Sequence, residues 1–157
     1  LDNEISLDIY IEEIVRSYQE ISDKIFLVNL EEFKHKVKSY KSPEIVYGLR
    51  NFIGNANKFS ENKIEIFLRS NNIETEILIK DDGPGFPKDL IDKARLGEPY
   101  IRTKDHKHIS KYGLGLGTFI GKTLLEKNFA NIVFKNSKDK SGAEVIIKWD
   151  NKDLINI

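Results

Sequence analysis

Apolar residues recur at helical spacing from Ile9 to Ile21, which predicts a helix near the start of the chain. The apolar run Ile25–Asn29 then predicts a short buried strand. Residues 34–41 are basic and polar without a clear period, so we expect a loop there.

A second helix is predicted to begin at Ser42 and to end near Phe59. Ser42 can cap the helix with its hydroxyl, and Pro43 is well tolerated at the first helical position. Glu44 places a negative charge near the positive end of the helix dipole. These three residues make this start the clearest helix signal in the chain.

Strand patterns dominate the rest of the chain. Lys63–Ser70 and Ile73–Lys80 alternate apolar and polar residues and are joined at Asn71-Asn72, which predicts a β-hairpin. Other expected elements are a short helix over 88–96, a helix from Leu116, and strands over 131–136 and 143–149. These elements predict an α+β fold, a two-layer α/β sandwich with a mixed, mostly antiparallel sheet packed on helices.

The second predicted helix carries an asparagine face. Asn51, Asn55 and Lys58 share one side at helical spacing, flanked by Gly48 and Gly54. A solvated polar face is the simplest explanation. However, Asn and Gly are poor helix formers, so their clustering favours a binding role in which something approaches the backbone. A carboxamide oxygen suits Mg²⁺, and a nearby Lys suits phosphate.

A turn of Asp81, Gly83 and Gly85 follows the hairpin's second strand. Asp-Gly and Pro-Gly pairs are common in ordinary tight turns. Alternatively, Asp81 can accept a hydrogen bond from an exocyclic amine such as that of adenine, while the glycines keep the wall of the site thin.

A glycine-leucine segment, Gly113–Gly117, leads directly into the predicted helix at Leu116. Free backbone N–H groups before a helix N-terminus can hold phosphate. The segment is not a P-loop, because Leu116 stands where that motif needs its upstream glycine. It is not a dinucleotide motif either, because Ile120 stands at the third glycine position.

Composition and charge narrow the functional classes. Basic and acidic residues both number 25, so no general attraction to nucleic acid or an anionic membrane surface is expected. The absence of Cys excludes disulfides and thiolate metal sites within the chain. No apolar run is long enough to span a bilayer, so we expect no direct membrane contact. The chain contains no Met, and we interpret residues 1–157 as a single domain from a longer protein.

Taken together, these motifs resemble the GHKL superfamily, which has the Bergerat ATP-binding fold and includes gyrase, Hsp90, MutL and histidine kinases. The matching segments are Leu49–Phe59 for the N box, Asp81–Gly85 for the G1 box, Gly113–Gly117 for the G2 box and Gly142-Ala143 for the closing glycine box, where many members carry Thr in place of Ala143. Within the superfamily the chain looks like a histidine kinase catalytic domain. Residues 94–100, residues 122–126 and Trp149 are similar to the RegB/PrrB type of sensor kinase.

The resemblance implies a role for each matching position. Asn55 would coordinate Mg²⁺, Asn51 and Lys58 would contact the phosphates of ATP, and Asp81 would bind the adenine amine. The other implied ATP contacts are Phe59 near the nucleoside, Gly83, Gly85 and Phe86 around adenine, Gly113, Leu114, Gly115, Leu116 and Gly117 around the phosphates, and Arg102 or Lys104 at the γ-phosphate. An ATP lid is expected over about residues 86–117.

The implied activity is transfer of the γ-phosphoryl group from Mg·ATP to a histidine on a separate dimerisation domain of the same protein. The implied downstream partner is a response regulator. No catalytic residue is expected in this segment, since the acceptor histidine and its acid lie on that other domain. The expected location is cytoplasmic, tethered to the inner membrane through upstream segments. Alternatives are an anti-sigma-type serine kinase and a non-catalytic ATP sensor. Asn51 stands where the superfamily's ATPases carry a water-activating Glu, and an amide cannot act as a general base.

Overall fold

The computed structural model describes residues 4–92 and 116–157. Its elements, in chain order, are β1 (Glu4–Ile5), α1 (Leu7–Gln19), β2 (Ile25–Phe33), β3 (Ser39–Tyr40), α2 (Pro43–Phe59), β4 (Lys63–Ser70), β5 (Glu74–Asp81), α3 (Lys88–Asp92), α5 (Leu116–Lys127), β6 (Asn131–Asn136), β7 (Ala143–Asp150) and α6 (Asn151–Ile155). Among the described helices, none combines the length and the apolar character needed to cross a bilayer.

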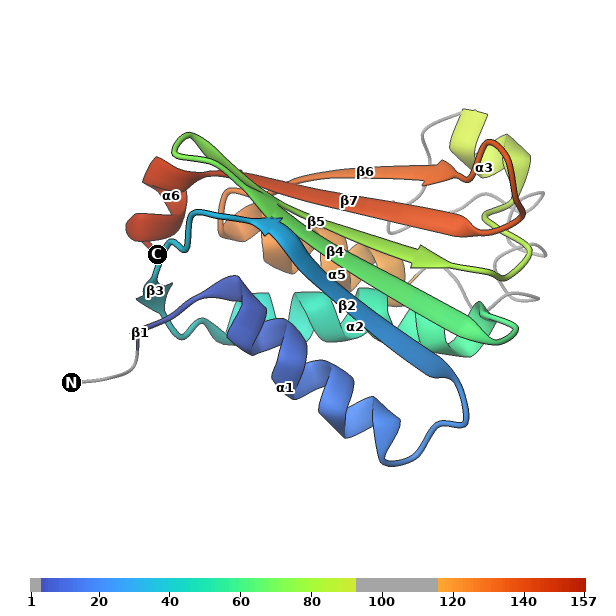
Figure 1. The fold of residues 1–157 in the computed structure, drawn as a ribbon. Helices are drawn as coiled ribbons and strands as arrows, with labels where there is room; N and C mark the ends of the chain where they lie inside the picture. The colour runs from blue at the N-terminus through green and yellow to red at the C-terminus, as the bar shows by residue number, and fades with distance from the viewer. Residues whose placement is uncertain (1–3, 93–115) are drawn as a thin grey trace.

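Within the described residues, five strands form the main sheet in the order β2-β4-β5-β7-β6. β2 pairs with β4 in parallel, whereas the other three pairings are antiparallel. Helices α1, α2 and α5 all lie on one side of this sheet (Figure 1). The predicted two-layer α+β sandwich with a mixed, mostly antiparallel sheet is therefore confirmed.

Local sequence signals explain the central elements. The hydroxyl of Ser42 accepts a hydrogen bond from the N–H of Ile45 at 3.4 Å, as expected of a helix cap. In the β4–β5 hairpin, Oδ1 of Asn71 accepts hydrogen bonds from the N–H groups of Ile73 and Glu74, at 2.8 and 2.9 Å. Both the helix start and the hairpin are confirmed.

The core lies between the helices and the facing side of the sheet. Alternate residues of β4 and β5, including Ile66 and Ile77, are fully buried against α2. Trp149 on β7 is also fully buried, and its indole N–H donates to the carbonyl of Asn128 at 2.9 Å. This bond ties the end of the sheet to the turn after α5.

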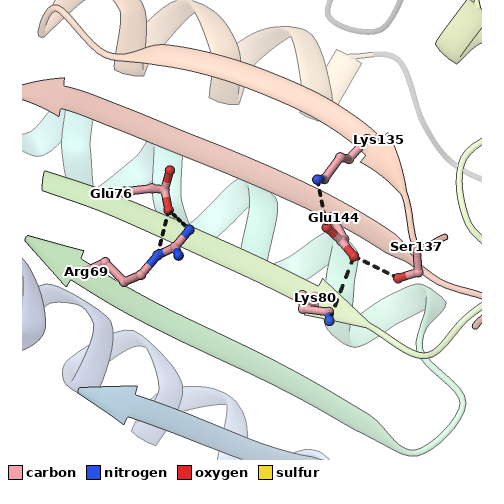
Figure 2. A network of polar contacts seen from close by, with 6 residues as sticks. All are labelled: Arg69, Glu76, Lys80, Lys135, Ser137 and Glu144. Carbon is pink, nitrogen blue, oxygen red and sulfur yellow. Dashed lines mark hydrogen bonds and ion pairs between the residues drawn. The ribbon is translucent and has the colours of Figure 1, made fainter. Parts of the chain in front are cut away.

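The opposite face of the sheet carries charged side chains (Figure 2). Glu144 accepts a hydrogen bond from Ser137 at 2.9 Å and pairs with Lys80 and Lys135 at 3.8 and 3.7 Å. Strand residues alternate between the two faces of the sheet. Since one face is charged, the core and any enclosed cavity lie on the other face, which the helices cover.

Two sequence predictions were wrong in extent. β2 continues four residues beyond Asn29 because it keeps pairing with β4 after a register shift between Asn29 and Glu32. The predicted loop over residues 34–41 contains β3, which pairs with β1. Both departures arise from pairing with distant segments, which a local pattern does not record.

Candidate functional site

A cavity opens between α2, α5 and the ends of β5, β6 and β7. It is lined by Phe52, Asn55, Ala56, Phe59, Ile79, Asp81, Gly85, Phe86, Thr118, Phe134, Ala143 and Val145. Its volume is about 500 Å³ including the open mouth. The structure thus brings together residues from the predicted N box, the G1 turn and the helix after the glycine-leucine segment.

Asp81 lies at the end of β5, where the strand reaches the cavity. Its Oδ1 accepts hydrogen bonds from the backbone N–H groups of Gly83 and Ala143, at 2.9 and 3.3 Å. For Oδ2, no donor is found within the described part of the chain. Burial raises the pKa of Asp81, although the two backbone hydrogen bonds oppose that rise. The carboxyl group therefore keeps acceptor capacity for a ligand on the cavity side.

Two glycines let the chain close tightly around Asp81. A Cβ atom at Gly83 would lie 2.1 Å from the carbonyl oxygen of Phe59. At Gly142, which has a φ of +136°, a Cβ would lie 2.0 Å from the carbonyl oxygen of Asp81. No other residue type fits at either position without moving the backbone. These glycines serve close packing of the chain on itself, and the role of Gly83 and Gly85 toward a ligand stays a prediction.

Asn136 joins β6 to the start of the predicted lid. Its Oδ1 accepts from the N–H of Phe86 at 2.7 Å, and its Nδ2 donates to the carbonyl of Phe86 at 3.0 Å. The Phe86 ring packs edge-on against Phe134, with centroids 5.7 Å apart, and Phe134 packs in turn against Phe52 at 5.8 Å. These rings give the cavity an aromatic wall on the β6 side.

The asparagine face of α2 is directed toward α5. Nδ2 of Asn51 donates to the carbonyl of Tyr47 at 2.8 Å, and Nδ2 of Asn55 donates to Oγ1 of Thr118 at 3.4 Å. A Cβ at Gly117 would lie 3.5 Å from Asn51 Oδ1 and 3.9 Å from Asn55 Oδ1. Both amide oxygens therefore lie near the first turn of α5.

The glycines beside this face serve helix packing. A Cβ at Gly48 would lie 2.6 Å from the side chain of Leu125 on α5, and one at Gly54 would lie 2.7 Å from the Tyr18 hydroxyl on α1. The expectation that these glycines admit a ligand to the helix backbone is therefore wrong, because the protein's own side chains fill the space beside them.

Several predicted residues stand apart from the cavity lining or outside the described residues. Lys58 is exposed, with Nζ 5.3 Å from the centre of the Phe59 ring. Leu116 begins α5, and its role toward a ligand stays a prediction. The predictions for Arg102, Lys104, Gly113, Leu114, Gly115 and most of the lid over residues 86–117 fall on residues 93–115, outside the described residues.

Sequence reasoning missed Thr118, Phe134 and Asn136. Thr118 directly follows the glycine-leucine segment, but its burial and its contact with Asn55 on α2 depend on the fold, so the sequence did not mark it. Phe134 and Asn136 lie on a strand whose contacts with Phe86 come from 48 and 50 residues away, so no local pattern marks them.

The chain is similar to known sensor kinases in sequence and in fold. It is 36% identical over 104 residues to the sensor histidine kinase RegB of Cereibacter sphaeroides, covering 63% of this chain and 22% of RegB. It is 28% identical over 151 residues to a putative sensor histidine kinase NtrY-like of Rickettsia conorii, covering 92% and 23%. The chain spans less than a quarter of the length of these relatives.

Solved structures with the same fold include the catalytic domain of histidine kinase ThkA, with a TM-score of 0.73 and 23% identity over 94% of this chain and 96% of that one. The mycobacterial sensor histidine kinase MprB has a TM-score of 0.71 and 19% identity, covering 96% and 97%. Residues 41–153 match the family described as histidine kinase-, DNA gyrase B-, and HSP90-like ATPase. With a matching fold and a family match over most of its length, the chain belongs to this ATPase family.

Proposed function

We propose that this domain binds Mg·ATP and transfers the γ-phosphoryl group to a histidine on a separate dimerisation domain of a longer sensor kinase. The observation that carries the proposal is the pair of amide oxygens on Asn51 and Asn55 beside the first turn of α5, with Asn55 lining the same cavity as Asp81. Membership in the ATPase family and similarity to RegB support it.

The residues around the cavity fit this ligand. The Oδ2 atom of Asp81, which lacks a donor among the described residues, suits the exocyclic amine of adenine. Phe86 and Phe134 supply aromatic surface for a base. The amide oxygen of Asn55 is a hard ligand suited to Mg²⁺, and Asn51 and Lys58, on the same helix, would contact the phosphates. When bound, Mg²⁺ would neutralise phosphate charge.

Asn51 favours phosphoryl transfer over hydrolysis. Its amide is already engaged with the Tyr47 carbonyl, and an amide has no basic site with which to remove a proton from water. A histidine acceptor needs no such base on α2, because the imidazole is itself a nucleophile. In this proposal the domain holds and orients ATP, and the acceptor domain supplies the nucleophile.

The partners follow from the same proposal. The dimerisation domain would carry the acceptor histidine, and a response regulator would receive the phosphoryl group afterwards. A cytoplasmic site of action, with tethering to the inner membrane through other parts of the longer protein, completes the proposed role.

Incubation with γ-labelled ATP tests the proposal, with and without the dimerisation domain of the longer kinase added separately. We expect label on that domain's histidine and little label on this chain. Strong self-labelling of this chain would contradict the proposal. Labelling of a serine on an added protein would favour an anti-sigma-type kinase, and ATP binding without any transfer would favour a nucleotide sensor.

A further inference from the structure

Thr118 occupies an unusual place for a hydroxyl group. It lies in the first turn of α5, is only 1% exposed, and lines the cavity beside Asn55. A buried hydroxyl needs a hydrogen-bond partner, and Oγ1 of Thr118 accepts from Nδ2 of Asn55 at 3.4 Å. This contact joins α5 to α2 at the residue whose oxygen suits Mg²⁺.

The contact occupies the nitrogen end of the Asn55 amide, which leaves the oxygen end available to a cation. A carboxamide has an oxygen end and a nitrogen end of nearly the same shape, and only the oxygen can bind a cation. On Asn51 the choice is made by a backbone carbonyl, that of Tyr47, which can only accept. On Asn55 the partner is the Thr118 hydroxyl, which can accept or donate; here it accepts from Nδ2 and anchors the amide in place.

We propose that Thr118 is a positioning residue that holds the amide of Asn55 with its oxygen toward the magnesium ion of bound ATP. The inference rests on the proposed function and deepens it. Thr118 itself does not touch the ion. Residues that hydrogen-bond to a metal-binding side chain commonly fix its orientation, and Thr118 would act on Asn55 in this way.

Substitution by an isosteric apolar residue separates orientation from shape. In Thr118→Val the volume is kept and the hydroxyl is lost, so the Asn55 amide is free to turn. ATP affinity would be measured by calorimetry on the whole chain, once with excess Mg²⁺ and once with EDTA. We expect the affinity gained from Mg²⁺ to fall by about tenfold or more, while affinity in EDTA stays within about twofold. Thr118→Ser, which restores the hydroxyl, should recover most of the gain.

Thr75→Val provides a matched control. Thr75 is also a buried threonine, bonded through Oγ1 to Asn151 at 2.6 Å, and it does not line the cavity. We expect this variant to keep the full magnesium-dependent gain. Thr118→Ala serves as a second hydroxyl-free variant and should show the same loss as Thr118→Val.

Each possible result has a distinct meaning. An unchanged magnesium-dependent gain in Thr118→Val, equal losses with Mg²⁺ and with EDTA, or failure of Thr118→Ser to recover the gain would overturn the role of Thr118 while leaving the proposed function intact. A wild-type chain that binds no ATP under either condition would overturn the proposed function and this inference with it.

Discussion

The side-chain amide of Asn136 holds the backbone of Phe86 at both its N–H and its carbonyl, at 2.7 and 3.0 Å. Through this double contact, β6 fixes the point where the chain leaves the cavity wall and enters the region of the predicted lid.

Replacing Asn136 with Ala should therefore weaken both the fold and nucleotide binding. Two backbone groups of Phe86 lose their partner, which should lower the free energy of unfolding by about 1–3 kcal/mol. ATP affinity should fall as well, because the aromatic wall formed by Phe86 is released. Thermal unfolding by circular dichroism and calorimetric titration check the two effects. Asn131→Ala, at an exposed position on the same strand, is the control. An unchanged ATP affinity would mean that Phe86 lies outside the nucleotide site.

Asp81→Asn should reduce ATP affinity without unfolding the turn. The Asn oxygen can still accept from Gly83 and Ala143, whereas the other end becomes a donor that opposes the adenine amine. A lost hydrogen bond to a charged group is equivalent to about tenfold to 100-fold in affinity. Titration of both proteins with ATP measures this, with unfolding temperature as the control. Equal affinity in the variant would remove Asp81 from the adenine site.

Asn51→Glu should introduce ATP hydrolysis. A carboxylate at this position can accept a proton from water, which the present amide cannot do. Phosphate release should rise above the wild-type background, while phosphoryl transfer to the dimerisation domain should not improve. Asn51→Gln, which lengthens the side chain without adding a base, is the matched control. Hydrolysis by the Gln variant at the same rate would show that side-chain length, and not basicity, explains the effect.

Asp8 should make the fold sensitive to acid. Burial raises the pKa of this carboxyl, but hydrogen bonds from Ser6 and Lys36 and the charge of Lys36 outweigh it and lower the pKa below 3.8. A lowered folded-state pKa means that the stabilisation is present above the unfolded value and is lost as pH falls through the folded one. Wild type should thus be more stable than Asp8→Asn at about pH 6, and the gap should close toward about pH 3. Unfolding temperatures across that range give the comparison. A gap that stays constant with pH would contradict this role for the carboxylate.

Gly142→Ala should destabilise the chain strongly. The added Cβ would lie 2.0 Å from the carbonyl oxygen of Asp81, in a backbone conformation with φ of +136° that favours glycine. We expect a loss of about 2 kcal/mol or more in the free energy of unfolding. Chemical denaturation measures it, and Lys140→Ala, at an exposed position two residues earlier, should have little effect. Similar losses in both variants would mean that the turn as a whole, and not Gly142, is sensitive.

Local signals predicted the parts of the fold that depend on neighbouring residues. The cap at Ser42 and the turn at Asn71 form as expected because their partners lie two or three residues away. The full length of β2 and the pairing of β3 with β1 depend on strands far along the chain, so the sequence pattern underestimated both.

The residues of the candidate site also fall into two groups, those that a local sequence pattern marks and those that it does not. Residues within a single motif, such as Asn51 and Asn55 on α2, were identified from their spacing. Thr118 and Asn136 were not, because their importance comes from contacts made 63 and 50 residues away. The roles that the resemblance assigns to individual residues toward ATP stay predictions for the experiments above.

The buried indole of Trp149 gives the domain a built-in optical probe. It is the chain's single tryptophan, and its contact with the Asn128 carbonyl couples it to the end of α5. It lies four positions along β7 from Val145 in the cavity wall, a distance of about 13 Å. Its fluorescence should therefore follow loss of the core, while occupation of the cavity should leave the emission nearly unchanged.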